Sequence, residues 1–346
     1  MISHNVRRNR NVILGVNMNE KLLKDLDAME KRLREYVEKG RTVGFCSVKD
    51  EPVIAVKPEK TKIRPLKKMV AFDVPFMAVD CSTRTLRRAN NWGIYLLRVT
   101  SVIVKERTVE WDFEERMYTA LGEAYVRRRL LQDARLELES EMALRILDNE
   151  NGDAYLLLDG ASYFGGERKF RASLYEKCEK MGIKLLTISK QSPSLHDEKG
   201  RDFMAAAYSL ADDQSIWVYH PIIQANIHEH LYGDVSLVKL CSESQRVFRC
   251  DVMAYLTVCS IEELLSPLTA ISEDPRCMGY PVALWLAHDF SAPAESKLLH
   301  YHDLVETKLA GAEILDTLKR EEISCNFVDE LHGSRYAFNW EWIENI

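Results

Sequence analysis

Three acidic residues lie at or near apolar runs of this 346-residue chain. Asp80 ends the strand-like run 70–79, Asp159 ends the strand-like run 154–158, and Glu139 lies on a predicted helix. An ionised carboxylate beside an apolar strand is costly to bury unless a positive charge compensates it. Carboxylate oxygens are also the ligands that hard divalent cations prefer. The three residues therefore predict a metal site.

Glu139 is one of three glutamates in the segment 137–141. Most of its helical neighbours, three, four and seven positions away, are apolar (Leu136, Met142, Ala143 and Ile146). Those of Glu137 include Asp133, Ser140 and Glu141, and those of Glu141 include Glu137, Arg145 and Asp148. We therefore expect Glu139 to face inward, with Glu141 as the alternative ligand. A simpler interpretation is an ion pair between Glu139 and an arginine such as Arg135, four positions earlier.

Two metal ions at these carboxylates could catalyse a phosphodiester displacement. If Asp80 and Asp159 end adjacent strands of one sheet, their carboxylates converge, and a crossing helix can present Glu139 to the same point. Two cations roughly 4 Å apart stabilise the attacking and leaving oxygens of a phosphodiester displacement. Taken singly, each aspartate is more simply interpreted as a turn residue.

The elements around these residues are expected in the order three strands, helix, strand, helix, strand. Their predicted ranges are 70–79, 93–104, 108–111, 112–147, 154–158, 168–181 and 183–188. The pair Asp112 and Glu115 has the pattern of a capping box and predicts where the long helix begins. This order is that of a ribonuclease H-like core. We therefore predict an α/β fold with a mixed central sheet flanked by helices, plus N-terminal helical and C-terminal extensions.

Further elements follow this core and precede it. Strands are expected at 215–219, 235–240 and 246–254, and helices from about Pro281 and Glu295. An N-terminal helix, capped by Asn19 and ending at about Lys39, carries an apolar seam. The seam is either a contact with a second subunit or the face by which the helix packs on the chain's own core. The seam residues are Leu22, Leu26, Met29, Leu33 and Tyr36. The predicted units are a helical and basic extension (1–68), a central domain that carries the three acidic residues (69–310, core about 70–190) and a C-terminal extension (311–346).

Composition excludes several classes of protein. The net charge is -6, so nucleic acid would have to bind a local basic groove rather than the whole surface. No run approaches the roughly 20 apolar residues that span a bilayer, and the first ten residues lack the apolar part of a signal peptide, so a cytoplasmic location is expected. The eight cysteines form no zinc-like spacing, and no GxxxxGK[ST] loop is present.

Several motifs together resemble the NurA nuclease family over about residues 70–310. They are Val79-Asp80-Cys81-Ser82 with the strand that begins at Gly93, Leu138-Glu139, Leu158-Asp159-Gly160, Ile188-Ser189-Lys190, and Gly279-Tyr280-Pro281 through His288. The family's tyrosine and histidine, eight residues apart, fall on Tyr280 and His288. The resemblance implies catalytic roles for Asp80, Glu139, Asp159, Tyr280 and His288, and metal ligation by the same set without Tyr280.

The resemblance also implies function and partners. Family members are nucleases that depend on Mn²⁺ or Mg²⁺, act as 5'-3' exonucleases and single-strand endonucleases in DNA end resection, and form homodimers beside the hexameric HerA ATPase. We expect Lys190 to hold the scissile phosphate. Arg84, Arg87 and Arg88 lie close enough to Asp80 to bind the DNA backbone, although solvated surface charge is the default interpretation of these arginines.

Two departures from the family pattern motivate a rival hypothesis. Cys81 stands where the family has glycine, and Ala161 stands where it has serine. If the glycine were needed for a positive φ or for close approach of DNA, Cys81 would obstruct the site. The rival is then a catalytically silent ribonuclease H-like protein that binds DNA or a partner. A third hypothesis is a zinc hydrolase using the pairs His228/His230 and His300/His302, although neither has the HExxH spacing of a helical zinc site.

Overall fold

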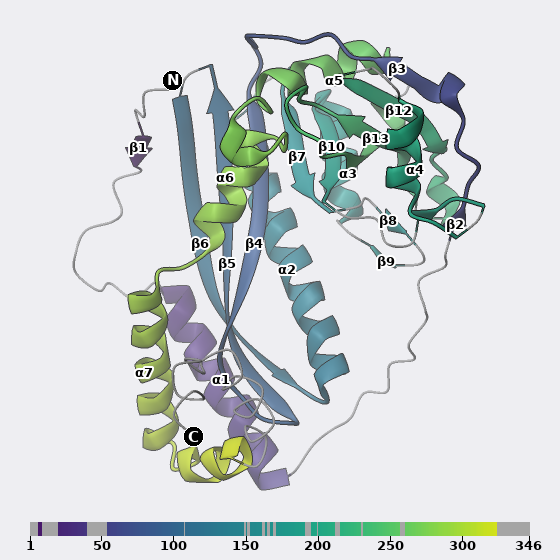
Figure 1. Ribbon diagram of the computed structural model, residues 1–346. Helices are drawn as coiled ribbons and strands as arrows, with labels where there is room; N and C mark the ends of the chain where they lie inside the picture. Colours follow the sequence, from purple (N-terminus) through teal and green to yellow (C-terminus); the bar gives the residue numbers. More distant parts are fainter. Residues whose placement is uncertain are drawn as a thin grey trace, which may run out of the picture.

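A computed structural model describes most of the chain. The described residues are 6–8, 20–39, 54–106, 108–148, 150, 153–160, 163–164, 167–168, 171–190, 195–198, 200–211, 215–229, 231–256 and 260–323. Within them, ten strands form one mixed sheet whose strand order is β1-β6-β5-β4-β7-β10-β14-β13-β12-β3. Figure 1 shows this sheet with helices on both of its faces.

The strands of the large sheet vary greatly in length. In sheet order they are β1 (Val6–Arg8), β6 (Thr108–Leu121), β5 (Trp92–Lys105), β4 (Phe76–Arg88), β7 (Tyr155–Asp159), β10 (Lys184–Ser189), β14 (Phe248–Met253), β13 (Gly233–Lys239), β12 (Trp217–Ile223) and β3 (Ile63–Pro65). Two small sheets pair β2 (Ile54–Ala55) with β11 (Leu195–His196), and β8 (Tyr163–Phe164) with β9 (Glu167–Arg168).

The helices pack on both faces of the sheet. They are α1 (Glu20–Lys39), α2 (Ala124–Leu147), α3 (Ala172–Met181), α4 (Phe203–Leu210), α5 (Ile261–Ala270), α6 (Val282–Ser291) and α7 (Glu295–Gly311). On one face, Arg127 of α2 donates to the hydroxyl of Tyr95. On the other face, Phe290 of α6 packs on Trp111 and Tyr301 of α7 donates to Glu115.

The central part of the sheet has ribonuclease H topology. The antiparallel meander β6-β5-β4 is followed by β7, parallel to β4, and β10, parallel to β7, with α2 and α3 connecting these strands. This is the predicted order of three strands, helix, strand, helix and strand. The predicted fold class is therefore confirmed. The proposed domain boundaries stay a prediction, although β3, within the predicted N-terminal extension, pairs with β12.

Two element boundaries were predicted wrongly. Asp80 does not end a strand, because β4 begins at Phe76, six residues after the predicted start, and continues to Arg88, nine residues past the predicted end. Likewise Asp112 and Glu115 do not begin a helix, because β6 continues to Leu121 and α2 begins at Ala124. Cross-strand pairing decides both cases, since β5 pairs with β4 on one side and with β6 on the other over nearly its whole length.

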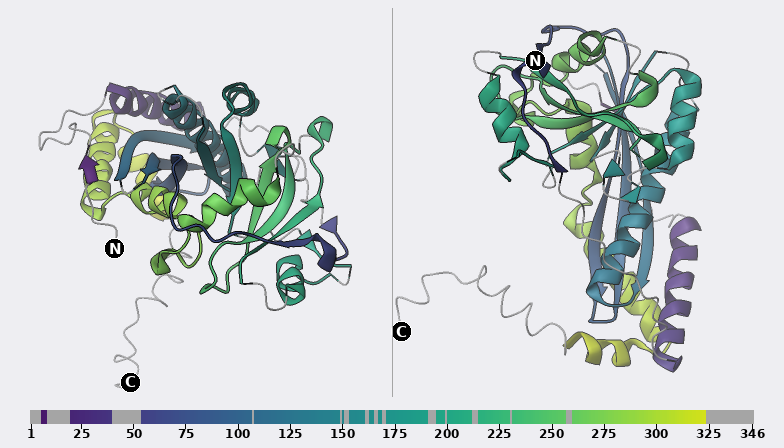
Figure 2. Two further views of the ribbon diagram at one scale, coloured as in Figure 1. Left: turned by 90° about the horizontal axis from the view of Figure 1, so that it is seen from above. Right: turned by 90° about the vertical axis from the view of Figure 1, so that its right-hand side faces the viewer.

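The long strands and two helices enclose a separate hydrophobic cluster, here called the distal core. Its buried members are Leu22, Leu26, Met29, Leu33, Tyr36, Ala89, Trp92, Ile94, Leu96, Met117, Tyr301, Val305, Leu309, Ala312, Ile314 and Leu318. All five seam residues of α1 belong to it. Figures 1 and 2 show α1 and α7 beside the far ends of β4, β5 and β6. The seam thus packs on the chain's own core, which was one of its two interpretations. Asn19 lies outside the described residues.

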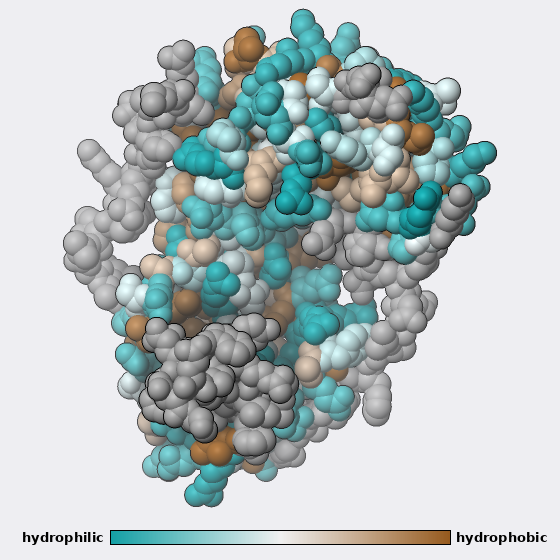
Figure 3. Space-filling view, in the orientation of Figure 1, coloured by the Kyte–Doolittle hydropathy of each residue, from teal (hydrophilic) through white to brown (hydrophobic). Residues whose placement is uncertain are grey.

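The surface seen in the orientation of Figure 1 is largely hydrophilic, with hydrophobic residues scattered over it (Figure 3). This face does not indicate where a second subunit would bind, so the homodimer stays a prediction. None of the helices in the described residues is long and apolar enough to cross a membrane.

Candidate metal centre

Asp80 and Asp159 lie side by side where two parallel strands separate. The register of β4 and β7 runs from Phe76 opposite Tyr155 to Val79 opposite Leu158 and then ends. Asp80 is the next residue of β4, and Asp159 is the last residue of β7. Gly160 follows with a φ of +110°, a conformation that residues with a side chain rarely adopt, and lets the chain turn away.

His288, from the last turns of α6, completes a three-residue cluster with these carboxylates. Its Nδ1 lies 2.7 Å from Oδ2 of Asp80. One ligand atom each of Asp80, Asp159 and His288 lies within 4.8 Å of the other two. Two carboxylates and an imidazole are a donor set that Mn²⁺ accepts, and Mg²⁺ accepts the carboxylates. The cluster therefore fits one divalent cation.

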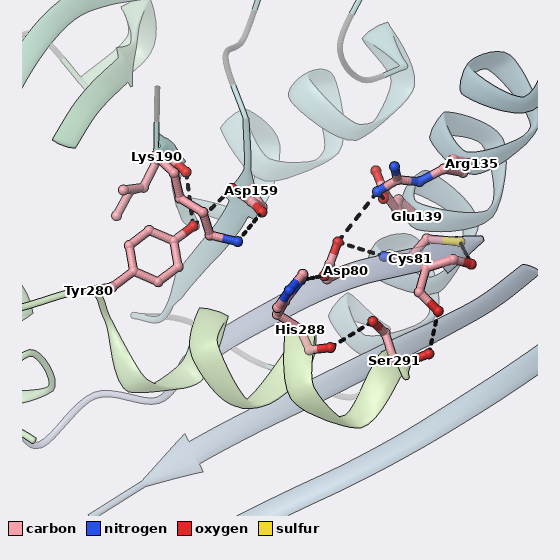
Figure 4. A network of polar contacts seen from close by, with 11 residues as sticks. Asp80, Cys81, Arg135, Glu139, Asp159, Lys190, Tyr280, His288 and Ser291 are labelled. Atoms are coloured by element: carbon pink, nitrogen blue, oxygen red, sulfur yellow. Dashed lines mark hydrogen bonds and ion pairs between the residues drawn. The ribbon is translucent and has the colours of Figure 1, made fainter. Parts of the chain in front are cut away.

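Tyr280 and Lys190 both contact Asp159 (Figure 4). The Tyr280 hydroxyl donates to Oδ1 of Asp159 at 2.9 Å and lies 3.1 Å from the carbonyl oxygen of Ile188. Lys190 Nζ lies 2.9 Å from Oδ2 of Asp159. Burial raises the pKa of Tyr280 well above its ordinary value, so the phenol stays protonated. Tyr280 thus fixes the orientation of Asp159, and Lys190 supplies a positive charge at the rim.

Tyr280 reaches the site from just before α6 rather than from within it. Pro281 is the N-cap residue of α6, and Gly279, with a φ of +88°, turns the chain into it. Tyr280 and His288 do face one site, as predicted, although the predicted helical spacing does not apply to Tyr280 itself.

Glu139 lies on the other side of Asp80, with Arg135 between the two carboxylates. Arg135 Nη2 is 3.6 Å from Oδ1 of Asp80 and 3.4 Å from Oε1 of Glu139. Glu139 does not belong to the cluster formed by Asp80, Asp159 and His288. The ion pair with Arg135, the simpler of the two interpretations of Glu139, is therefore present in the structure. Glu141 is exposed on the same helix.

The concentrated charge shifts three pKa values. Burial pushes the pKa of Asp80 upward, but the hydrogen bond with His288 and the charge of Arg135 outweigh it and leave the pKa lowered. The same hydrogen bond raises the pKa of His288. Burial, reinforced by the charges of Asp80 and Asp159 and opposed by Arg135, raises the pKa of Glu139 to about 8. Excess negative charge at a site is the condition that favours cation binding.

Cys81 occupies a position that does not need the positive φ of a glycine. It lies inside β4 without a positive φ, and its side chain is buried. Its backbone N–H donates to Oδ1 of Asp80 at 2.8 Å. A glycine is therefore not required here for backbone conformation. Ala161, the second departure from the family pattern, lies outside the described residues.

The three arginines predicted to grip DNA have different surroundings. Arg87 is buried, with Nη2 2.5 Å from Oε2 of Glu322 and Nη1 3.4 Å from Oε2 of Glu306. A β-bulge between Thr85 and Arg87 turns it toward these partners. Arg87 is therefore a structural residue, and its predicted role in substrate binding is dropped. Arg84 and Arg88 are exposed, and Arg84 has no ion-pair partner among the described residues.

The histidine pairs form no cluster with other metal-binding side chains in the described part of the chain. His300 and His302 lie on α7, where residues two apart point in different directions. His228 is described, whereas His230 lies outside the described residues. The zinc hypothesis therefore gains no support.

Sequence reasoning missed the reach of Arg135 to Asp80 and the bonds that hold α6 against β4. Ser82 donates to the carbonyl of Ser291, and the Ser291 hydroxyl donates to the carbonyl of His288 at 2.8 Å. These contacts position His288 over Asp80. The Arg135–Glu139 spacing was visible in the sequence, whereas the contact between Ser82 and Ser291, 209 residues apart, left no local signal.

The strand order and helix placement define a ribonuclease H-like fold. Comparison with solved structures places NurA in this class beside the present chain: one NurA structure has a TM-score of 0.50 at 10% identity and covers 86% of this chain and 97% of that one. NurA bound to dAMP and manganese gives 0.48 at 11% identity over 82% and 96%. The catalytic domain of human endonuclease V gives 0.39 at 12% identity over 79% and 95%.

The predicted NurA-like fold is therefore confirmed. No protein-family profile and no curated protein matches the sequence. At 10% identity the structural likeness shows the fold alone, and activity has to be argued from the site.

Proposed function

We propose that this chain is a DNA nuclease of the NurA type that depends on a divalent metal ion. The observation that carries the proposal is the convergence of Asp80, Asp159 and His288 within 4.8 Å, at the point where two parallel strands of a ribonuclease H-like sheet separate. Lys190 supports it, because a cation at the rim of an acidic cluster suits a substrate with a phosphate group.

The proposed reaction is hydrolysis of a phosphodiester bond. A bound Mn²⁺ or Mg²⁺ would supply Lewis acidity and a water of lowered pKa. Asp80 and Asp159 would hold the ion, and His288 would be its third ligand. Tyr280 would keep Asp159 aimed at the ion through its hydroxyl.

Lys190 and the arginines would act on the substrate rather than on the ion. In this proposal Lys190 exchanges its contact with Asp159 for the scissile phosphate. Arg84 and Arg88 contact phosphates farther along the strand. Arg84 lies four residues along β4 from Asp80, about 13 Å at strand spacing.

The finer parts of the proposal follow from the family resemblance. They are 5'-3' exonuclease and single-strand endonuclease activity in DNA end resection, a homodimer, a cytoplasmic location and a partner ATPase of the HerA type. The absence of a GxxxxGK[ST] loop from the sequence fits a motor on a separate chain.

Degradation of end-labelled DNA tests the proposal. Single- and double-stranded substrates are incubated with wild type in Mn²⁺, Mg²⁺ or chelator, and with Asp80→Asn and Asp159→Asn. Asp112→Asn, an exposed aspartate on β6, is the matched control. We expect metal-dependent cutting that falls at least about 100-fold in the two site variants and is unchanged in the control. Wild-type inactivity in every metal would favour the silent binding protein.

A further inference from the structure

Asp80 has two carboxylate oxygens that face different partners. Its Oδ2 lies 2.7 Å from His288 Nδ1, on the side of the three-residue cluster. Its Oδ1 accepts from the backbone N–H of Cys81 and lies 3.6 Å from Arg135 Nη2. A carboxylate that bridges two ions gives one oxygen to each of them. Here one oxygen faces the candidate ion position and the other faces a guanidinium (Figure 4).

Arg135 lies where a second ion would find its ligands. An ion beside Oδ1 of Asp80 would take Glu139 as its other protein ligand, and Arg135 Nη2 already lies 3.4 Å from Oε1 of Glu139. Such an ion, bound to Oδ1 of Asp80 and Oε1 of Glu139, would share both ligands with the Arg135 guanidinium. The two positive groups would then lie close together and repel each other. The guanidinium and a second ion therefore compete for the same two carboxylates.

The charges of the site also match one ion better than two. Three carboxylates, of Asp80, Glu139 and Asp159, face two permanent cations, Arg135 and Lys190. In the state that an approaching divalent ion favours, with all three carboxylates ionised and His288 neutral, the site carries one excess negative charge. One divalent ion turns it into one positive charge, which a single scissile phosphate neutralises. A second ion would leave three positive charges on a partly buried site, which is unfavourable.

Arg135 is anchored in this position by its helix. It lies four residues before Glu139 on α2, so the two side chains share a face and meet without any change in the helix. Its Nε is buried without a hydrogen-bond partner, whereas the side chain as a whole is 42% exposed. The thiol of Cys81 lies beside it as well.

We propose that the Arg135 guanidinium takes the place of a second divalent ion, so that this chain binds one catalytic cation, at Asp80, Asp159 and His288. The inference rests on the proposed nuclease function and changes its mechanism from two ions to one ion and a fixed organic cation. Arg135 is a positioning residue in this scheme, because it acts through Asp80 and Glu139.

Manganese stoichiometry tests the inference without measuring activity. Mn²⁺ is titrated into the full chain, and free and bound ions are counted by electron paramagnetic resonance. Wild type is expected to bind one ion, and Arg135→Met two, with the spin coupling of ions about 4 Å apart. Arg128→Met, an exposed arginine on the same helix, is the control and should bind one. Two ions in wild type, or one in Arg135→Met, would overturn the inference.

A second variant covers the case in which Arg135→Met does not fold. Glu139→Gln in the wild-type background should still bind one ion, because Glu139 pairs with the Arg135 guanidinium and is not a ligand of the ion. Loss of that ion would make Glu139 a ligand and overturn the inference. Failure of the inference can be distinguished from failure of the proposed nuclease function. If wild type binds two ions and cuts DNA, the proposed function holds and only the role of Arg135 is refuted.

Discussion

Metal binding at this site should release protons, in an amount that the structure allows us to estimate. Without metal, Glu139 has a pKa of about 8, so at pH 6.5 it is protonated in all but about 3% of molecules. His288, whose pKa is raised above 6.5, is more than half protonated at that pH. An arriving divalent ion requires the neutral imidazole of His288 as a ligand, and its charge at Asp80 lowers the pKa of the neighbouring Glu139, which is not a ligand. Release of between about 1.5 and 2 protons per ion is expected at pH 6.5.

The sign of the pH dependence follows from the same two shifts. Both pKa values are raised, so the protons that compete with the ion leave as the pH rises. Apparent Mn²⁺ affinity should therefore increase by more than about tenfold per pH unit near pH 6.5. The increase should become smaller by pH 8.5, where about a quarter of the Glu139 side chains remain protonated.

Calorimetry in two buffers measures the released protons. Mn²⁺ is titrated at pH 6.5 in buffers of different ionisation enthalpy, and the slope of heat against that enthalpy gives the number of protons. Glu139→Gln should lower it by about one. Glu137→Gln, an exposed glutamate of α2 paired with Arg171, should leave it unchanged. A heat of binding that does not depend on the buffer would refute this account of the site's electrostatics.

Three further variants separate structural from substrate contacts. Arg87→Ala leaves the carboxylate of Glu322, which is only 12% exposed, without its ion-pair partner and should lower the free energy of unfolding by about 3 kcal/mol in a urea titration; a change below about 0.5 kcal/mol would show that this ion pair contributes little to stability. Arg84→Ala should weaken DNA binding and reduce its salt dependence by about one phosphate contact, with unchanged stability, as measured by fluorescence anisotropy at several salt concentrations; an unchanged salt slope would remove Arg84 from the DNA path. Leu33→Ala, fully buried in the distal core, should cost about 3 kcal/mol of unfolding free energy while light scattering shows the same oligomeric state as wild type; dissociation of an oligomer would instead make α1 a subunit contact.

The order of elements could be predicted because the core strands are continuous apolar runs. Ala154 to Leu158 and Ile183 to Ile188 are covered by helices on both faces, and each was placed within one or two residues. The ends of the long strands were harder to predict, because their far halves extend beyond the main hydrophobic core. In β6 the stretch from Asp112 to Leu121 is rich in charged residues, so a capping box was predicted where cross-strand pairing with β5 in fact continues the strand.

The site was predictable in part. Asp80 and Asp159 could be paired because each follows an apolar strand segment, and His288 came from the family's spacing. The surroundings of Arg84, Arg87 and Arg88 could not be distinguished, because the bulge that turns Arg87 toward Glu322 has no signal in a run of similar residues. Arg135 was anticipated only as an ion-pair partner of Glu139, since helical spacing says nothing about its reach to Asp80.

The central claim is that the ion held by Asp80, Asp159 and His288 drives DNA cleavage. The most direct test is a single Mn²⁺ titration in which bound ion, from electron paramagnetic resonance, and the rate of nucleotide release from end-labelled DNA are measured on the same samples. We predict that the rate rises in proportion to the bound ion and that both are lost in Asp159→Asn. Cleavage that persists in Asp159→Asn without bound ion, or an ion bound by wild type without cleavage, would contradict the claim.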